Sequence, residues 1–444
     1  MRIKSFTVGG FKNLPKTTIN LNKSTAIIAI NNFGKSNLLE ALSFGLEFIY
    51  QSPKLRKRLM GYIKGIPLNP CLDSRDFIFE IEFETQSEKS LYSCATYGYS
   101  FSWYKDNNSG CKITNEWLKV KENDNSKYSC LIDRSEKKIR KSKKTFYSQE
   151  LAIDDTQLLI DFIGNESAID YKDIIDNIKN LTFKLCSSIS NEESFIPMPI
   201  EYMSNDDSLY ESLDHNDIPK ALFALKSQSP EKYELFVDSI KTLFPDFSDI
   251  VIESSTLSNV KIKKLVISNS ETNNEETNTN EDGDEPPFKL RDEYYKLLIK
   301  SDFYNQPINI NRMSAGTQRT FWILANAIIS GNASSLMGIE ELETSLHPRL
   351  LKNLLESLDE SMDYTPLIFT SHSPNLIQYL KPEQYYIGIP NPEGVALFKK
   401  IAPSKYNKLI AAAQSEGLSV GNFIFELLSG ESASINRLNK FLED

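Results

Sequence analysis

The sequence predicts an α/β fold with a mixed central sheet, an antiparallel β-layer and a helical insertion. Three observations lead to this prediction. A β-branched run at residues 25–30 passes through a glycine-containing turn into a segment with helical spacing of its apolar residues. Residues 77–84, apart from the first ones, alternate between apolar and polar side chains, as half-buried strands do. Two further apolar runs, at 336–339 and 366–369, each end in a polar cluster, which is typical of buried parallel strands.

Composition narrows the class of protein. A chain of 444 residues suits one large domain or two to three ordinary ones. Its hydrophobic content of 40% suffices for a sizeable core. A net charge of −10 argues against a uniformly basic coat for nucleic acid. No apolar run reaches the roughly 18 residues of a membrane span, and the N-terminus lacks a signal-peptide core, so no membrane partner is expected. The five cysteines are scattered and odd in number, which favours reduced thiols in a cytoplasmic protein.

Residues 25–41 have the layout of a phosphate-binding loop. The strand is followed by the turn Asn31-Asn32-Phe33-Gly34, then by Lys35, Ser36 and Asn37 at the start of a helix that extends to about residue 50. Backbone N–H groups of such a turn converge on one point and favour an anion there. Lys35 is placed to reach the β- and γ-phosphates of a nucleotide, and the Ser36 hydroxyl to ligate Mg²⁺. Alanine, Ala29, stands six residues before the lysine, where this layout ordinarily has glycine.

The segment after this helix is basic and then rich in strands. Leu55, Leu59 and Ile63 lie on one stripe of a predicted amphipathic helix with lysine and arginine on its other faces. Strands are expected at 77–84, 91–103, 113–120 and 128–132. The basic run 137–144 is either a solvated hairpin tip or, with its nearby aromatic residues, a nucleic-acid contact.

The remaining chain divides by pattern into an insertion and a C-terminal segment. Residues 150–245 are mostly helical in pattern, and the tract 268–287 is acidic and of low complexity, so a disordered loop is expected there. We therefore predict an N-terminal lobe at 1–150, a mainly helical insertion at 151–300 and a C-terminal lobe at 301–444.

Three motifs in the C-terminal lobe carry candidate chemistry. Ser314 is placed to cap an apolar helix, and Gly316 lets another backbone approach closely. The strand at 336–339 ends in Glu340 and Glu341, of which one can hold the hydration shell of Mg²⁺ and the other can orient or deprotonate water. The strand at 366–369 ends in a Thr-Ser-His-Ser cluster whose His372 is placed to donate to a γ-phosphate.

These motifs and the phosphate-binding loop together resemble the ABC-type P-loop ATPase heads of the RecF, SMC and OLD-like group. The resemblance covers about residues 1–50 and 305–390. The loop resembles the group's Walker A motif, Ser314-Ala315-Gly316-Thr317-Gln318 its signature motif, Glu340-Glu341-Leu342-Glu343 its Walker B motif, and Thr370-Ser371-His372-Ser373-Pro374 its switch histidine. His347, in the Leu-His-Pro turn that follows Walker B, is expected to support that turn.

The resemblance implies roles for these residues. ATP is the expected substrate and Mg²⁺ the expected cofactor. Heads of this group work in pairs, so an ATP-dependent head-to-head dimer or a larger homo-oligomer is expected, with the signature motif acting on the partner's nucleotide. The implied nucleotide-binding residues are Asn31, Asn32, Phe33, Gly34, Lys35, Ser36, Asn37, Ser314 and Gly316. The implied metal ligands are Ser36 and Glu340, and the implied catalytic residues are Glu341 and His372.

Three functions remain open at this point. The first is an ATPase subunit of a bacterial anti-phage defence system, similar to PARIS-type or Septu-type ATPases, which senses a phage trigger and controls a separate effector nuclease or toxin. OLD nucleases continue into a Toprim domain, and the roughly 55 residues after the last motif strand leave no room for one. The second is a RecF-like ATPase of DNA repair or chromosome maintenance. The third is a nucleotide-gated scaffold with little hydrolysis, which the variant Ala29 and Glu340 keep open. DNA is left open as a partner.

Overall fold

The structure is a computed structural model. It describes residues 2–73, 75–85, 91–105, 110–123, 125–135, 138–142, 145–147, 153–163, 171–187, 193–196, 200–202, 217–256, 288–290, 293–330, 335–362 and 365–443. The described chain divides into two compact units. Unit 1 comprises Met1–Ser188 and Ser330–Asp444, and unit 2 comprises Ile189–Ile329. The acidic tract 268–287 lies outside the described residues.

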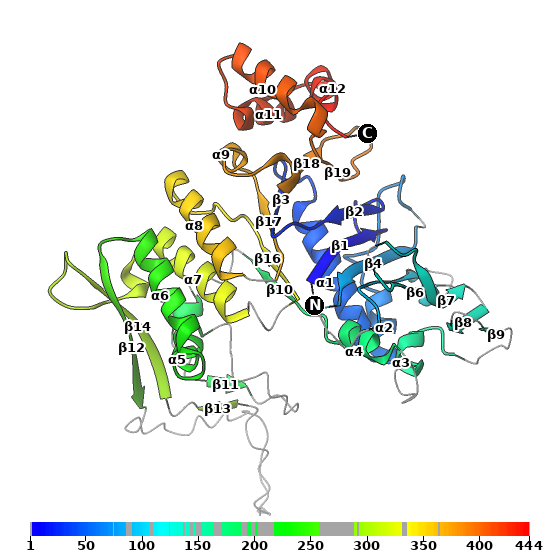
Figure 1. Ribbon diagram of the computed structural model, residues 1–444, viewed down its shortest axis with the longest axis horizontal. Helices are drawn as coiled ribbons and strands as arrows, with labels where there is room; N and C mark the ends of the chain where they lie inside the picture. Colours follow the sequence, from blue (N-terminus) through cyan, green and yellow to red (C-terminus); the bar gives the residue numbers. More distant parts are fainter. Residues whose placement is uncertain are drawn as a thin grey trace, which may run out of the picture. The chain divides into compact units, whose positions relative to one another are not determined.

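An antiparallel sheet forms one layer of unit 1 (Figure 1). Its strands follow the spatial order β2 (Thr17–Asn20), β1 (Arg2–Gly9), β4 (Phe77–Glu84), β5 (Cys94–Ser102), β6 (Lys112–Lys121), β7 (Ser129–Ser135), β8 (Lys138–Ser142) and β9 (Thr145–Tyr147). Every second residue of β4 is buried, as its alternating sequence predicts. The basic run contributes the antiparallel pair β8 and β9, whose side chains lie outside the described residues.

A second sheet runs through the centre of unit 1. Its spatial order is β10 (Phe183–Cys186), β16 (Leu336–Ile339), β17 (Leu367–Ser371), β3 (Ser24–Ile28), β18 (Tyr385–Ile389) and β19 (Leu397–Lys399). All its neighbours pair in parallel except β19, which is antiparallel to β18. The predicted mixed sheet and antiparallel layer are thus confirmed. Because β16, β17 and β3 are neighbours, their carboxyl ends meet at one edge.

Helix α1 (Lys35–Tyr50) packs in the core that joins the two sheets. One hydrophobic cluster contains side chains of α1, of the antiparallel sheet and of the central sheet. Gly45 is required at the closest approach, because a Cβ there would lie 2.0 Å from Cδ2 of Phe79. The Tyr99 hydroxyl donates to the Gly45 carbonyl over 2.7 Å at the same place. Helix α1 is therefore packed closely against β4 and β5 of the antiparallel sheet at this point.

The basic stretch after α1 forms the short helix α2 (Pro53–Met60). Its buried residues are Arg56 and Met60, and the predicted stripe is wrong because the helix ends before Ile63, which is exposed. Arg56 is buried because it caps the end of α1: its Nε donates to the Phe48 carbonyl over 2.8 Å, its Nη2 donates to the Ile49 carbonyl, and its Nη1 pairs with Asp161. An arginine buried in this way satisfies main-chain carbonyls that the helix itself leaves unpaired.

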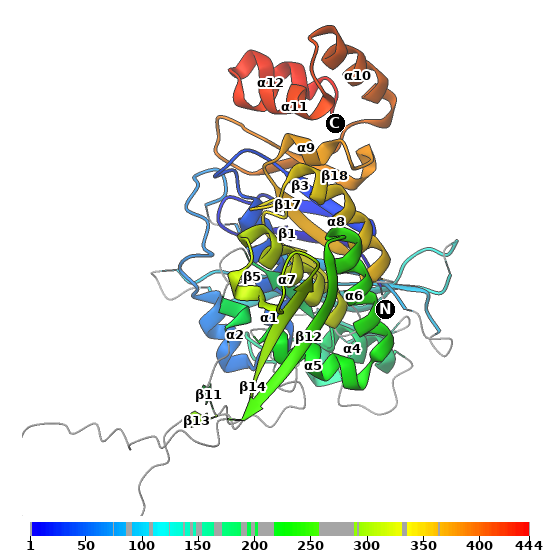
Figure 2. The same ribbon diagram turned by 90° about the vertical axis from the view of Figure 1, so that its left-hand side faces the viewer.

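The remaining helices of unit 1 include a C-terminal group of three. They are α3 (Leu159–Ile163), α4 (Lys172–Lys179), α8 (Pro348–Ser361), α9 (Pro374–Ile377), α10 (Tyr406–Ser415), α11 (Val420–Ser429) and α12 (Ser432–Asn439). The last three form a group beside α9 in both views (Figures 1 and 2). A Cβ at Gly421 of α11 would lie 2.0 Å from the carbonyl oxygen of Pro374 in α9, so these two helices touch backbone to backbone. In the part of the chain that the structure describes, no helix has the length and apolar character needed to span a bilayer.

Unit 2 combines helices with short sheets. Its elements are α5 (Ile218–Gln228), α6 (Pro230–Leu243), β11 (Ile200–Tyr202), β12 (Phe247–Thr256), β13 (Phe288–Leu290), β14 (Glu293–Ser301), β15 (Ile308–Asn309) and α7 (Ala315–Ser330). Strands β12 and β14 form a long antiparallel pair beside α5 and α6 (Figure 2). Phe321 of α7 is fully buried and contacts Phe236, Phe244 and Phe247.

The unit boundaries differ from the expected 150 and 300. Residues 153–187 belong to unit 1, because β10 pairs with β16 of the central sheet and α3 and α4 bury their apolar faces in the unit 1 core. Residues 301–329 belong to unit 2, because α7 packs on the aromatic cluster of that unit. The signature motif therefore lies in unit 2, whereas Walker A and Walker B lie in unit 1.

One buried acid of the antiparallel layer makes the stability depend on pH. Glu116 of β6 is fully buried and accepts hydrogen bonds from the backbone N–H groups of Leu159 and Ile160 at the start of α3. Burial raises the pKa of Glu116 from 4.5 to about 7. The two backbone hydrogen bonds, the charge of Arg134 and the hydroxyl of Tyr97 lower the pKa, but they offset only part of this rise. A pKa that is raised on folding stabilises the fold below the unfolded pKa, and this contribution is lost as the pH rises through the folded pKa.

We therefore expect Glu116→Gln to flatten the pH dependence of the unfolding free energy. In the parental chain, this residue lowers that free energy by on the order of 3 kcal/mol between about pH 4.5 and pH 7. Glutamine does not ionise, so this part of the slope disappears. It keeps an acceptor for only one of the two N–H groups, because Leu159 and Ile160 donate to different carboxylate oxygens, so the variant should also be less stable at every pH. Urea unfolding at several pH values measures it, with Glu360→Gln at an exposed position of α8 as the matched control. An unchanged slope in Glu116→Gln would contradict the assignment.

Candidate functional site

The phosphate-binding loop connects β3 to α1 at the carboxyl edge of the central sheet. Asn32 and Gly34 both have positive φ, 59° and 110°. Gly34 is required here, because a Cβ would lie 2.9 Å from that of Ala396 and 3.0 Å from Oδ1 of Asn13. Left-handed residues in such a turn direct successive N–H groups into one concavity, and the positive end of α1 adds to its attraction for anions.

Lys35 lies folded against this loop. It is 7% exposed, and its Nζ donates to the carbonyls of Ala29 and Ile30 over 2.8 and 3.0 Å. Burial lowers the pKa of Lys35, and the negative charges of Glu341 and Glu343 oppose that shift. The ammonium group is thus held beside the loop by carbonyls that a phosphate can replace as partners.

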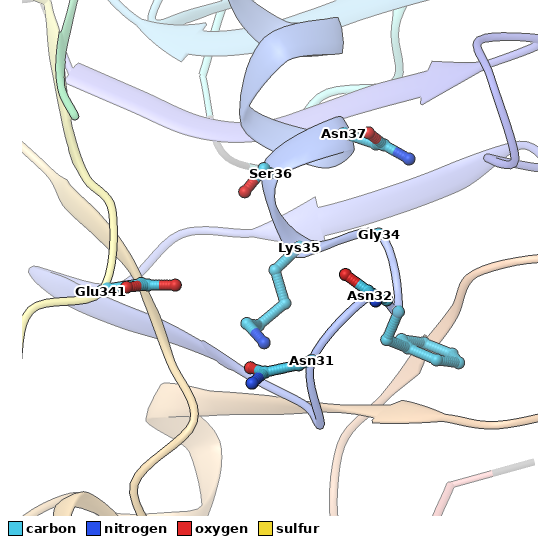
Figure 3. Close-up of a pocket in the computed structure, with 8 residues that line it drawn as sticks. Asn31, Asn32, Gly34, Lys35, Ser36, Asn37 and Glu341 are labelled. Carbon is cyan, nitrogen blue, oxygen red and sulfur yellow. The ribbon is translucent and has the colours of Figure 1, made fainter. Parts of the chain in front are cut away.

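The loop encloses one side of a cavity of about 600 Å³. Figure 3 shows Glu341 pointing toward the loop, with the Ser36 hydroxyl directed toward the Glu341 side. The residues that line the cavity are Asn31, Asn32, Phe33, Gly34, Lys35, Ser36, Asn37 and Glu341. The structure therefore brings the predicted loop residues and the second acid of Walker B to one place.

Asn37 faces this cavity only in part. Its side-chain amide donates to Oδ1 of Asn13 over 2.8 Å and points away from Glu341 (Figure 3). The side-chain amide of Asn13 in turn donates to the Phe33 carbonyl over 3.5 Å, and the main-chain carbonyl of Asn13 accepts from the Ala396 N–H over 2.9 Å. Asn13 thus supports the outer side of the loop, and sequence reasoning missed it because it lies 24 residues from Asn37.

The alanine at position 29 is accommodated by a glycine on the neighbouring strand. Ala29 is fully buried and is not among the described residues with positive φ. A Cβ at Gly388 of β18 would lie 2.5 Å from that of Ala29 and 2.6 Å from Cδ1 of Phe33. The missing side chain at Gly388 therefore leaves room for the methyl group of Ala29. Ile28 of β3 pairs with Ile387 of β18, which places the next residues, Ala29 and Gly388, side by side.

The Walker B acids follow β16 in different environments. Glu341 has a φ of 47°, and its N–H donates to the Thr370 hydroxyl over 2.9 Å. The Thr344 hydroxyl donates to Oε2 of Glu341 over 3.2 Å, which orients the carboxylate. Positive φ in a residue other than glycine is strained, and strain of this kind is concentrated at functional sites. Glu340 is half-buried beside the same turn, and its N–H donates to the Cys186 carbonyl; it is not one of the residues that line the cavity.

His372 follows β17 and contacts the third acid of the Walker B motif. The main-chain N–H of His372 donates to Oε1 of Glu343 over 2.7 Å, and Nδ1 of its ring lies 3.2 Å from the same oxygen. His347 has a structural position instead: its Nδ1 accepts from the Arg349 N–H and caps α8. The adjacency of β16 and β17 brings Glu343 and His372 together, although they are 29 residues apart.

The signature motif forms the start of α7 in unit 2. Ser314 is exposed, and its hydroxyl accepts from the Thr317 N–H over 3.2 Å, which confirms the predicted cap. Gly316 is half-exposed in the first turn, where its carbonyl accepts from the Thr320 hydroxyl. Exposed N–H groups at such a helix start are available to an anion.

The residues of unit 1 fit the ATP and Mg²⁺ that the resemblance implies. A nest of N–H groups, a lysine and a helix N-terminus suit a triphosphate, whereas the Ser36 hydroxyl and the carboxylates provide the hard oxygen ligands that Mg²⁺ prefers. No group of three or more His, Cys, Asp or Glu residues within the described ranges is arranged to hold a metal ion.

Comparison with known proteins agrees with this fold. The SMC head bound to the C-winged helix domain of ScpA is 12% identical, with 92% of this chain and 100% of that chain covered and a TM-score of 0.50. The SMC head domain from Thermotoga maritima is 13% identical over 90% of this chain and 100% of that chain, with a TM-score of 0.43. The Smc head with an extended coiled coil bound to the C-terminal domain of ScpA, derived from Pyrococcus furiosus, is 12% identical over 93% and 99%, with a TM-score of 0.46. At 12% identity, the first of these structures shows a shared fold and nothing more.

Among curated proteins, none matches the chain significantly. One family model does match, and it is described as "AAA domain, putative AbiEii toxin, Type IV TA system". The match extends over residues 24–378, from β3 through the phosphate-binding loop, the signature motif and Walker B to just beyond α9. Because it spans most of the chain and includes each of these motifs, the chain belongs to this family of AAA domains, with the fold of an SMC-type ABC ATPase head.

Proposed function

We propose that the protein is an ATP-binding and ATP-hydrolysing ABC-type ATPase subunit. The observation that carries this proposal is the cavity in which the loop N–H groups, Lys35, Ser36 and the Glu341 carboxylate meet. A set of donors and one strained, oriented carboxylate facing the same space suits phosphoryl transfer to water, for which positioning and electrostatics provide most of the catalysis.

Each residue has a distinct role in the proposed reaction. The loop N–H groups and Lys35 hold the β- and γ-phosphates, with Lys35 moving from the carbonyls of Ala29 and Ile30 to the phosphate oxygens. The Glu341 carboxylate orients a water and accepts its proton as the water oxygen bonds to the γ-phosphorus and the bond to the β–γ bridging oxygen breaks. The His372 ring donates to a γ-phosphate oxygen. Ser36 directly, and Glu340 through water, would hold Mg²⁺, which would supply positive charge beside the phosphates.

The proposed unit of activity is a homo-oligomer in which the signature motif acts on the nucleotide of the partner. The supporting observation is that Ser314 and the first turn of α7 are exposed. Gly316→Glu places a carboxylate at this surface, where it repels the γ-phosphate, so we expect intact ATP binding with hydrolysis lost.

Mixing two inactive variants tests this arrangement. Lys35→Ala removes the Walker A lysine and keeps the signature motif intact. Gly316→Glu disrupts the signature motif and keeps Walker A intact. In a mixed dimer, one site combines the intact Walker A of one protomer with the intact signature of the other. We expect about a quarter of the parental turnover from an equal mixture, because about half of the dimers are mixed and each has one complete site. A mixture that stays inactive, while both variants are folded and associate, overturns the trans arrangement.

We further propose that this ATPase belongs to a bacterial anti-phage defence or toxin–antitoxin system and controls a separate effector nuclease or toxin. The family description, which names a toxin of a Type IV system, supports this assignment. The test is phage plating on cells that express the chain with its neighbouring genes. Plaque counts should fall with the parental chain and recover with Lys35→Ala. Plaque counts that neither chain changes would contradict the proposal.

Two alternatives have their own support. The fold shared with SMC heads favours a RecF-like ATPase of DNA repair or chromosome maintenance, with DNA as a partner. The position of Glu340 outside the cavity lining favours a nucleotide-gated scaffold with little hydrolysis. The neighbouring genes would distinguish a repair ATPase from a defence ATPase. A steady-state ATPase assay would distinguish a scaffold with little hydrolysis from an active ATPase.

A further inference from the structure

The third acid of the Walker B motif, Glu343, has a position that the nucleotide-binding roles do not explain. Its side chain is only 10% exposed, whereas that of its partner His372 is 42% exposed. One carboxylate oxygen, Oε1, lies within bonding distance of two nitrogens of His372, the main-chain N at 2.7 Å and the ring Nδ1 at 3.2 Å. A single carboxylate oxygen thus contacts both the backbone and the ring of this residue.

The turns that carry the two residues are bound to each other as well. The N–H of Glu341 donates to the Thr370 hydroxyl over 2.9 Å, and the N–H of Leu342 donates to the Thr370 carbonyl over 3.1 Å. These bonds continue the parallel pairing of β16 and β17, which ends at Ile339 and Phe369. The segment that presents Glu341 to the cavity is therefore the same segment that holds His372.

The charge of Glu343 also reaches the phosphate-binding loop. Together with Glu341, it opposes the lowering of the Lys35 pKa by burial. Glu343 is therefore close to the place where the γ-phosphate is expected, yet it is not among the residues that line the cavity. A carboxylate so placed acts on the nucleotide through a neighbour, as outer partners of catalytic histidines do.

We propose that Glu343 is a positioning residue that keeps Nδ1 of His372 turned toward its carboxylate and leaves Nε2 for the nucleotide. This inference rests on the proposed ATPase function of the site. A proton on Nδ1 faces Oε1, so the ring cannot rotate without losing that interaction. When Nε2 also carries a proton and donates to a phosphate oxygen, the ring is cationic, and the buried carboxylate compensates its charge.

Kinetics distinguish this role from simple bracing of the turn. Glu343→Gln keeps an acceptor oxygen for the main-chain N–H but has no charge, whereas Glu343→Leu has neither. We expect Glu343→Gln to fold normally, to keep the KM for ATP and to lose kcat by about 10- to 100-fold, as other outer-partner substitutions do. In a His372→Ala background the same substitution should have no further effect, because the residue through which it acts is gone.

The ring nitrogens provide a readout that does not require turnover. The chain has three histidines, so selective ¹⁵N labelling gives three resolvable rings. His372 should carry its proton on Nδ1, and Glu343→Leu should abolish that preference. His347 is the internal control, because its Nδ1 accepts from the Arg349 N–H and its proton must be on Nε2 in both chains.

Failure of this proposal and failure of the proposed function give different results. If the parental chain does not hydrolyse ATP, the ATPase assignment fails, while the nitrogen spectra still report whether Glu343 holds the ring. If the parental chain hydrolyses ATP and Glu343→Gln has the parental kcat, the proposal is overturned. It is also overturned if Glu343→Gln lowers kcat by the same factor with and without His372, or if the His372 spectrum is unchanged in Glu343→Leu.

Discussion

Replacing Glu341 with glutamine is expected to slow ATP hydrolysis on the order of 10²–10⁴-fold while ATP binding stays near the parental level. Glutamine keeps the size of the side chain and an oxygen that can accept from the Thr344 hydroxyl, but it cannot accept the proton of the attacking water. The backbone bond from residue 341 to Thr370 is independent of the side chain and should keep the strained turn in place. The closed, ATP-loaded oligomer should therefore accumulate.

The matched control is Glu340→Gln, one residue away. Glu340 does not line the cavity and is assigned to Mg²⁺ through water, so this variant should show weaker dependence on or affinity for Mg²⁺ as well as lower turnover. Equilibrium ATP retention and steady-state hydrolysis, each measured across a Mg²⁺ series, separate the two. If Glu341→Gln fails to bind ATP while Glu340→Gln binds it and turns over slowly, the two roles are reversed.

Lys35→Ala is expected to weaken ATP binding by about 10- to 100-fold and to remove measurable hydrolysis. A hydrogen bond to a charged partner contributes about 1.5–3 kcal/mol, and this lysine is the cation that the loop provides at the cavity. The substitution also leaves the Glu341 and Glu343 charges without the opposing ammonium group, which further disfavours an anion in the cavity.

Two measurements make this result interpretable. The melting temperature of Lys35→Ala shows whether loss of the bonds to the Ala29 and Ile30 carbonyls has disturbed the fold. Lys352→Ala, on the exposed face of α8, is the same substitution away from the cavity and should bind ATP normally. Parental hydrolysis by folded Lys35→Ala would show that the loop is not the nucleotide site.

The parts of the site that the sequence revealed are those built from neighbouring residues. The strand, turn and helix around Lys35 follow from local spacing, and so does the cap at Ser314. The cavity itself depends on the order of β16, β17 and β3, which parallel strands far apart in the chain adopt only through tertiary packing. The proximity of Glu341 to the loop is therefore predicted by the family resemblance and not by any local sequence pattern.

The parts that sequence reasoning missed depend on contacts between distant segments. Asn13, Thr370 and Glu343 each bind a site residue that lies 24 to 29 positions away. Glu343 and Thr370 both lie in motifs that the sequence shows, but the partners that they bind could not be read from those motifs. Arg56 was assigned to a solvated helix because its charge dominates the pattern, and only the end of α1 explains its burial.

The contact between α9 and α11 connects the C-terminal helices to the segment that follows His372. Pro374 lies two residues after His372, and Gly421 touches its carbonyl with no room for even a methyl group. A movement of α11 toward α9 would therefore press on the main chain next to His372. By thermodynamic reciprocity, a ligand of the C-terminal helices that changes the affinity for ATP has its own affinity changed by ATP by the same factor. A binding curve for such a ligand, recorded with and without nucleotide, would give the coupling free energy directly.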